Sequence, residues 1–193
     1  LLPLTGHGRA HILVAEDNPD LRQFLYDLLS SYYHVATVAD GLPGNHVFML
    51  HIDPKGVMWI GTNNGLARMK GGTFEVLTTS DGLFNNAVFS MATARDGTLW
   101  VGSFGAGARY ATIEDRPMAQ WSWQRWLGQV GSRDRQVWTF AETGDGDLFI
   151  GSDVGVTRWR NQGRDVVHLD LEPEQMDELR RLLAASDGAI WAS

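Results

Sequence analysis

An internal repeat constrains the fold of this 193-residue chain more than any other feature. Residues 41–69, GLPGNHVFMLHIDPKGVMWIGTNNGLARM, align without a gap on residues 82–110, GLFNNAVFSMATARDGTLWVGSFGAGARY. A third copy begins at residue 135 and a fourth at residue 182. The aromatic residue that marks each copy recurs at spacings of 41, 49 and 42 residues: Trp59, Trp100, Phe149 and Trp191. A period of this length indicates repeated units that bury a core only by packing against their neighbours.

Each copy has the pattern of antiparallel strands joined by glycine-containing turns. An alternating run such as VFSMATA leads into a hairpin such as RDGT and then a strand such as LWVGS. The period matches a four-stranded β-propeller blade, so we expect a mainly β fold of about three blades and a partial fourth, preceded by a short βαβ segment. The expected blades span residues 42–80, 81–125, 130–170 and 179–193, after a tail at 1–8 and the βαβ segment at 9–41.

The tryptophans divide into two groups with different expected roles. The aromatic residues in phase with the repeat should pack between neighbouring blades. The insertion at 111–135 adds Trp121, Trp123 and Trp126, which would either stack on the rings of a sugar ligand or pack against an adjacent blade. Residues 173–185 also leave two alternatives open: a short helix that starts at Pro173, or the strand that the repeat phase requires.

Residues 9–41 have the pattern of a strand, a helix and a second, parallel strand. Residues 12–15 form a short apolar run that is typical of a buried parallel strand. Asn18 followed by Pro19 suits the start of a helix. The helix should pack on the sheet through one apolar stripe, formed by Leu21, Phe24, Leu25, Leu28 and Leu29. Residues 34–39 complete the unit as the second strand.

Two adjacent carboxylates, Glu16 and Asp17, follow the first of these strands. Ligands of α/β units bind at the carboxyl ends of the strands, and paired carboxylates suit a hard cation such as Mg²⁺. The alternative is that Asp17 and Asn18 only cap the helix. The site is therefore either a Mg²⁺ pair or a helix cap.

Asp53 is the one nearby aspartate that could accept a phosphoryl group after a third parallel strand. That topology needs a crossover of about a dozen residues, whereas only GLPGNH at 41–46 lies between the two segments, and this stretch contains proline and glycine. We therefore expect Asp53 to be a decoy and the chain to have no phosphoacceptor.

The two parts of the chain resemble domains of two-component signalling proteins. Residues 9–41, with the EDN sequence at 16–18, resemble the first third of a response-regulator receiver domain, which implies that Glu16 and Asp17 match its Mg²⁺ pair. Residues 42–193 resemble the two-component-regulator propeller repeats of hybrid sensor kinases, whose motif is similar to the DGLPGN and DGLFNN stretches here. In that family the repeats form periplasmic sensors, often of glycans, while the receiver lies across the membrane. This chain joins the two directly.

Composition limits the partners. The formal net charge of −7 argues against nucleic acid or an anionic lipid surface as a general partner. No run approaches the roughly 20 apolar residues of a membrane span, and no signal peptide is evident, so the sequence does not assign a location. The chain contains no cysteine, and its six histidines are scattered, so the sequence pattern does not predict a metal site built from them. We expect the chain to be a fragment, because it lacks an initial methionine and stops at GAIWAS.

The leading interpretation is a non-catalytic signal-transduction fragment, in which sensor propeller repeats are joined to a non-functional receiver start. It would require no cofactor beyond the candidate Mg²⁺, and its open blades would pair with remaining blades or self-associate. One alternative is a propeller enzyme that resembles the streptogramin lyases. Another is a glycan-binding propeller module.

Overall fold

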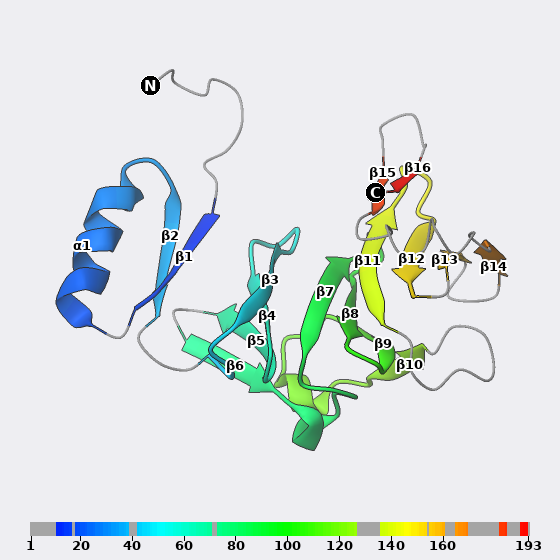
Figure 1. Ribbon diagram of the computed structural model, residues 1–193, viewed down its shortest axis with the longest axis horizontal. Helices are drawn as coiled ribbons and strands as arrows, with labels where there is room; N and C mark the ends of the chain where they lie inside the picture. Colours follow the sequence, from blue (N-terminus) through cyan, green and yellow to red (C-terminus); the bar gives the residue numbers. More distant parts are fainter. Residues whose placement is uncertain are drawn as a thin grey trace. The chain divides into compact units, whose positions relative to one another are not determined.

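The chain divides into two compact units, residues 1–42 and 43–193. In the computed structural model, the described residues are 11–16, 18–38, 42–70, 73–126, 136–153, 155–160, 165–169, 182–184 and 190–192. The fold is mainly β, with several four-stranded antiparallel sheets and one helix near the N-terminus, as predicted (Figure 1).

The first unit has the expected strand, helix, strand order. Strand β1 (His11–Ala15) and strand β2 (His34–Val38) pair in parallel, and helix α1 (Pro19–Ser30) connects them. The Asn18 side-chain oxygen accepts hydrogen bonds from the backbone N–H groups of Asp20 (2.9 Å) and Leu21 (3.0 Å). These bonds satisfy two donors that the first helical turn leaves without helical partners, so Asn18 is the helix cap.

The apolar stripe of α1 is only partly covered. Leu25 and Leu29 are half-buried, whereas Phe24 remains 59% exposed and Leu28 53% exposed. The expectation that the whole stripe packs on the sheet is therefore wrong for these residues. A sheet of two strands is narrower than the stripe, so it covers one edge of the helix only.

The described part of the second unit contains three four-stranded sheets, which are called blades 1, 2 and 3 here. In each, the strands are antiparallel and follow one another in sequence order across the sheet. Blade 1 comprises β3 (Val47–Ile52), β4 (Met58–Thr62), β5 (Gly65–Lys70) and β6 (Thr73–Leu77). Blade 2 comprises β7 (Val88–Thr93), β8 (Thr98–Ser103), β9 (Gly107–Thr112) and β10 (Gln124–Trp126).

Blade 3 and a further strand pair continue the series. Blade 3 comprises β11 (Val137–Glu142), β12 (Leu148–Ser152), β13 (Gly155–Arg160) and β14 (Asp165–Leu169). The pair β15 (Leu182–Ala184) and β16 (Ile190–Ala192) lies where a fourth copy was expected. Residues 173–181 lie outside the described residues, so the helix alternative there stays untested. Two short 3₁₀ turns, η1 (Thr79–Asp81) and η2 (Met118–Gln120), lie in the connections.

The first strands of successive blades, β3, β7 and β11, lie side by side (Figure 1). The glycine of the repeat motif permits this approach. A Cβ placed on Gly61 would lie 2.6 Å from the carbonyl oxygen of Val88 in blade 2, and one on Gly102 would lie 2.8 Å from that of Val137 in blade 3. Both distances are shorter than real Cβ atoms tolerate, so any side chain at these positions would push the blades apart.

At residues 103–107 the strand register of blade 2 moves by one residue relative to that of blade 1. Between the second and third strands, blade 1 has two residues, Asn63 and Asn64, and blade 2 has three, residues 104–106. Trp59 consequently pairs with Arg68, whereas Trp100 pairs with Tyr110. The ungapped alignment, which matches Arg68 to Arg109, is wrong beyond this point because a slip of one residue turns each side chain to the opposite face.

The core lies between the blades. Trp59 is fully buried and Trp100 is 2% exposed, which confirms their expected packing role, while Phe149 is half-buried. One core cluster joins blades 1 and 2, and a second joins blades 2 and 3. Among the described residues, no helix is long and apolar enough to cross a membrane.

Candidate ligand-binding pocket between blades 2 and 3

The space between the outer parts of blades 1 and 2 is filled by a segment of the chain itself. This segment, residues 113–123, connects β9 to β10 and is called the wedge here. Met118 is fully buried, and Trp121 is 5% exposed with its ring centroid 5.9 Å from that of Trp59. The Trp121 indole N–H donates to the carbonyl oxygen of Arg116 at 2.9 Å. The wedge therefore supplies both apolar and polar contacts to this groove.

Arg68 of β5 holds the wedge electrostatically. Its guanidinium carbon lies 5.2 Å from the centroid of Trp121 and 5.7 Å from that of Trp59, within the range of cation–π attraction. The same guanidinium pairs with Glu75, and the Glu75 carboxylate also accepts the backbone N–H of Met118. The Arg68–Glu75 ion pair of blade 1 thus also binds the wedge.

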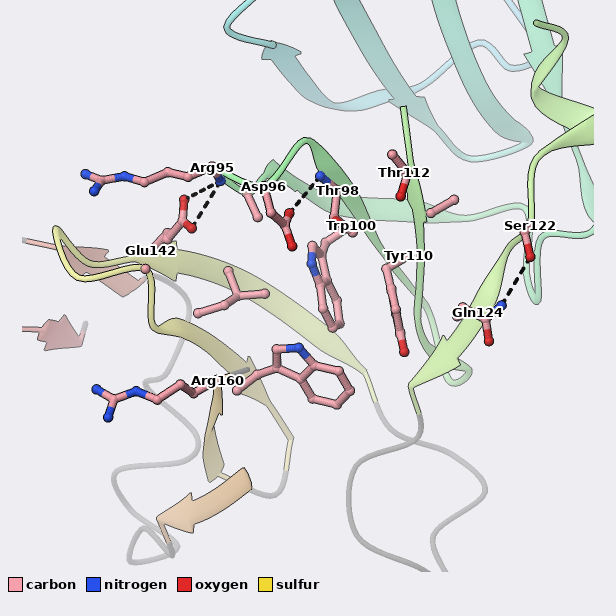
Figure 2. Close-up of a pocket in the computed structure, with 15 residues that line it drawn as sticks. Arg95, Asp96, Thr98, Trp100, Tyr110, Thr112, Ser122, Gln124, Glu142 and Arg160 are labelled. Carbon is pink, nitrogen blue, oxygen red and sulfur yellow. Dashed lines mark hydrogen bonds between the residues drawn. The ribbon is translucent and has the colours of Figure 1, made fainter. Parts of the chain in front are cut away.

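The corresponding space between blades 2 and 3 is an open pocket of about 740 Å³. Blade 3 joins its third and fourth strands through residues 161–164 alone, whereas the same connection in blade 2 spans residues 113–123. The volume lies within the ~300–1,000 Å³ range of small-molecule sites. The pocket is lined by Ala94, Arg95, Asp96, Thr98, Trp100, Tyr110, Ala111, Thr112, Ser122, Gln124, Glu142, Gly146, Leu148, Trp159 and Arg160 (Figure 2).

Three aromatic side chains form one wall of the pocket. Trp100 of β8 and Tyr110 of β9 stack with ring centroids 4.4 Å apart, because their positions are direct partners across the two strands. Trp159 of β13 meets Trp100 edge-on at 5.3 Å and Tyr110 at 5.6 Å. Burial raises the pKa of the Tyr110 hydroxyl, so this group is a neutral hydrogen-bond donor and acceptor at neutral pH.

The remaining lining is polar and carries charges of both signs. The Glu142 carboxylate accepts the backbone N–H of Arg95 at 2.9 and 3.1 Å, which ties the blade 2 turn to blade 3. Arg160 forms a two-bond ion pair with Asp147, and this hydrogen bonding lowers the pKa of the Asp147 carboxyl. In Figure 2 the Arg95 and Arg160 guanidinium groups point away from the labelled aromatic rings. The pocket therefore presents hydroxyl, amide and carboxylate groups beside an aromatic wall.

The structure assigns Asp53 a role in a hairpin turn. Its side chain is buried at the β3–β4 connection, where one carboxylate oxygen accepts the backbone N–H groups of Lys55 and Val57, each at 2.9 Å. The other oxygen accepts the indole N–H of Trp59 at 3.2 Å. A carboxylate with three donors and 3% exposure is held as a structural acceptor within blade 1, and the expectation that Asp53 accepts no phosphoryl group stays a prediction.

The candidate Mg²⁺ residues are described only in part. Glu16 follows β1, and its carboxylate accepts the backbone N–H of Asn18 at 3.0 Å. Asp17 lies outside the described residues. No group of three or more His, Asp or Glu side chains suited to a metal occurs among the described residues. The Mg²⁺ pair therefore stays a prediction, while the alternative cap is present at Asn18.

The tryptophans of the insertion do not form one exposed platform. Trp121 packs in the wedge, and Trp126 of β10 is 5% exposed in the core between blades 2 and 3. Trp123 is half-buried, with its ring stacked on that of Trp121 at 5.7 Å and its N–H donated to the Met118 carbonyl at 3.0 Å. These positions match the packing alternative of the sequence analysis. Ligand binding by the three remains untested.

The pocket residues were missed because sequence reasoning treated repeat-phased aromatics as core alone. One signal was present. The hairpin position that is Asp53 in blade 1 is Ala94 in blade 2 and Thr143 in blade 3, as the aligned copies already display. Blade 2 therefore lacks the polar turn residue of the other two blades, although it keeps the tryptophan of the motif. This difference indicates that the surroundings of that tryptophan differ from those in blade 1.

Two stretches of the second unit match a protein family. The family is described as the two component regulator propeller, and the matches cover residues 41–64 and 82–105. Each match runs from just before the first strand of a blade to its second strand, so the two matches correspond to blades 1 and 2.

Comparison with known proteins links the chain to signalling proteins and to propellers. A segment of 38 residues, 20% of this chain and 2% of the relative, is 47% identical to hybrid signal transduction histidine kinase D of Dictyostelium discoideum. The extracellular domain of BT4673 from B. thetaiotaomicron, described as a hybrid two component system, is similar with a TM-score of 0.60 and 21% identity over 79% of this chain and 21% of that one. The chain thus spans about a fifth of that domain.

An enzyme shares the same fold. Virginiamycin B lyase from Staphylococcus aureus is similar with a TM-score of 0.56 and 17% identity, over 76% of this chain and 48% of that one. At such identities the likeness establishes the β-propeller fold and leaves function to the residues of the site.

Proposed function

We propose that this chain is a non-catalytic sensing fragment of a two-component hybrid regulator. The observation that carries the proposal is the coincidence of the two matched repeats, 41–64 and 82–105, with two blades that have the same strand order and the same glycine contact to the next blade. The 38-residue match to a hybrid histidine kinase supports the same class of protein. In this role the blades bind a signal molecule or a partner and release it unchanged.

The N-terminal unit acts in this proposal as a receiver-like segment without phosphotransfer. Asp53 has no access to a phosphoryl donor, because it is buried and accepts three hydrogen bonds. We expect that incubation of the full chain with acetyl phosphate and Mg²⁺ adds no phosphoryl group, as measured by intact mass. A gain of one phosphoryl group that Asp53→Asn abolishes would contradict this part of the proposal.

The test of sensing separates binding from turnover. A library of soluble oligosaccharides, peptides and amino acids is screened against the full chain by thermal shift, and each hit is recovered and analysed by mass spectrometry. The proposal expects at least one hit that is recovered unchanged. A hit that the chain chemically converts, or a library without any hit, would count against it.

The lyase fold likeness makes one enzyme control necessary. Virginiamycin B is incubated with the full chain and Mg²⁺, and the mass and ultraviolet spectrum of the antibiotic are followed. The sensing proposal expects no conversion. Conversion that chelation of Mg²⁺ stops would favour the enzyme alternative instead.

A further inference from the structure

The arginines on the outer strands of the blades differ in their partners. In blade 1, Arg68 of β5 lies directly opposite Glu75 of β6, and the two side chains form an ion pair. In blade 3, Arg160 of β13 forms its two-bond ion pair with Asp147. Each of these cations has a carboxylate from its own blade, which offsets the cost of taking a charge partly out of water.

In blade 2 the third and fourth strands instead bring two arginines together. Arg109 of β9 lies directly opposite Arg125 of β10 in the antiparallel pair. Side chains at such positions share a face of the sheet, with their Cβ atoms about 4.5–5.5 Å apart, and like charges there repel each other. Among the described residues, neither arginine forms an ion pair with a carboxylate. Two positive charges therefore lack a counter-charge, in a chain whose formal net charge is −7.

One aromatic ring contacts both guanidinium groups. The guanidinium carbon of Arg109 lies 3.9 Å from the ring centroid of Phe84, and that of Arg125 lies 4.5 Å from it. Cation–π attraction holds the two side chains at this ring, but a neutral ring does not cancel their charge. In the aligned first copy of the repeat this position is Pro43, so both the ring and the arginine pair are features of blade 2.

The hydrogen bonds of Arg109 are incomplete. Its Nη1 donates to the carbonyl oxygen of Trp123 at 3.3 Å, whereas its buried Nε has no partner in the described part of the chain. Burial and, to a smaller extent, the Arg125 charge lower the pKa of the Arg109 guanidinium, which still remains protonated at neutral pH. Arg109 is half-buried and Arg125 is exposed, so an ion from solvent can reach the pair.

We propose that Arg109 and Arg125 form an anion site that binds a dianionic phosphate group, either free phosphate or the phosphate of a monoester. Guanidinium donors match the oxygen atoms of phosphate, and two positive charges balance a group of about −2. A bound phosphate gives the pair the counter-charge that Glu75 gives to Arg68 in blade 1. A monocarboxylate balances only one of the two charges.

This site is separate from the pocket between blades 2 and 3. Tyr110 lines that pocket, and Arg109 is its neighbour on the same strand. Successive side chains of a strand point to opposite faces of the sheet, so the arginine pair lies on the other face of blade 2. Phosphate binding there does not depend on the proposed sensing function.

The experiment measures anion affinity of the full chain by isothermal titration calorimetry. The titrations are done at low, constant ionic strength and slightly alkaline pH, where phosphate is a dianion and charge screening is weak. Inorganic phosphate and glycerol 3-phosphate distinguish the two sources of the phosphate group, and acetate is the monoanionic arm. We expect at least one phosphate probe to bind, and acetate to bind at least tenfold more weakly.

Two variants and one control test the residues. Arg125→Glu places a carboxylate opposite Arg109, as blade 1 does with Glu75, so it should raise the melting temperature and abolish detectable phosphate binding. Arg125→Gln changes an exposed side chain and should weaken phosphate binding at least tenfold. Arg116→Gln removes the same charge from an exposed side chain that is already paired with Glu114, and it should leave the affinity unchanged.

The outcomes separate the anion site from the proposed function. Unchanged phosphate affinity in both Arg125 variants overturns the site, and so does a full chain that binds neither phosphate probe. An equal loss in Arg116→Gln would show that phosphate responds to net charge alone, which also overturns it. Acetate that binds as tightly as phosphate overturns the ligand class. The sensing proposal is tested by the wider ligand library, so each can fail while the other stands.

Discussion

The two spaces between consecutive blades are alike near the motif glycines and differ farther out. In both, a motif glycine lets the next blade approach closely, at Gly61 between blades 1 and 2 and at Gly102 between blades 2 and 3. Farther out, the first space is filled by the wedge, with Trp121 against Trp59, whereas the second remains a pocket of about 740 Å³. One structural repeat thus produces a sealed groove and an open one.

The difference teaches that connections between strands, rather than the strands, determine where a ligand can enter. Blades 1 and 2 share their strand order and turn geometry. The β9–β10 connection, residues 113–123, is longer than the matching connections of the other two blades, residues 71–72 and 161–164, and it fills the groove beside blade 1. Insertions in loops are tolerated in repeat folds, because each strand keeps its own hydrogen-bond partners.

The largest effect is expected from removal of the wedge tryptophan. Trp121→Ala should cost about 3–5 kcal/mol of unfolding free energy, because a large buried ring is replaced by a cavity. Urea denaturation of the full chain followed by circular dichroism measures this loss. Trp159→Ala, in the open groove, is the comparison and should cost clearly less, since Trp159 is already half-buried. Equal losses would mean that the two grooves are packed alike.

Both motif glycines should be intolerant of a side chain. Gly61→Ala and Gly102→Ala should each cost about 2–3 kcal/mol, because the added methyl group would meet a backbone carbonyl of the next blade. Urea denaturation again measures the loss of unfolding free energy. Gly56→Ala is not a suitable control, because the backbone φ of 80° at Gly56 would itself strain an alanine. A cost at Gly61 alone would show that the inner contacts differ between the grooves as the outer ones do.

Substitution of Asp53 by alanine gives the turn of blade 1 the residue that blade 2 has at this position, Ala94. Asp53→Ala should cost about 2 kcal/mol, since it leaves the Trp59 indole N–H and two backbone N–H groups without their acceptor. Thermal and urea denaturation measure the loss. Asp96→Ala in the blade 2 turn is the control and should cost less, because Asp96 is exposed and accepts a single bond there. A larger loss at Asp96 would reverse the assigned roles of the two turns.

The smallest effect concerns pH at the contact between blades 1 and 2. His51 of β3 and Thr93 of β7 are joined by a 2.8 Å hydrogen bond, and burial lowers the pKa of His51, partly offset by the Asp53 charge. Because the folded state holds the neutral ring, stability is present above the unfolded pKa of ~6.5 and is lost as pH falls below it.

The pH prediction is checked by urea denaturation at pH 7.5 and pH 5.5. The chain should lose more unfolding free energy between these values than His51→Gln, which has no titrating group at this position. An equal loss in both proteins would show that the His51 imidazole does not contribute to the acid sensitivity.

Much of the blade architecture could be predicted from particular residues. Trp59, Trp100 and the glycine two positions after each mark one unit, because only glycine fits against the next blade. The strand register of blade 2 beyond Ser103 could not be predicted from the sequence. The loop after this residue is one residue longer than the matching loop of blade 1, so Arg109 does not take the position in blade 2 that Arg68 has in blade 1. The alternation of apolar and polar residues indicates which residues share a face of a strand, but it does not show how many residues belong to the loop between two strands.

By itself, the sequence determined the repeat, the antiparallel strands and the parallel pair with its Asn18 cap, because these depend on periodicity, turn residues and contacts between near neighbours. Only the tertiary structure decided that Trp121 seals one groove, while Trp100 lines an open pocket in the other. Both facts depend on residues brought together from different blades and loops. A side chain's burial and its hydrogen-bond partners are set by those distant neighbours, which the local pattern does not specify.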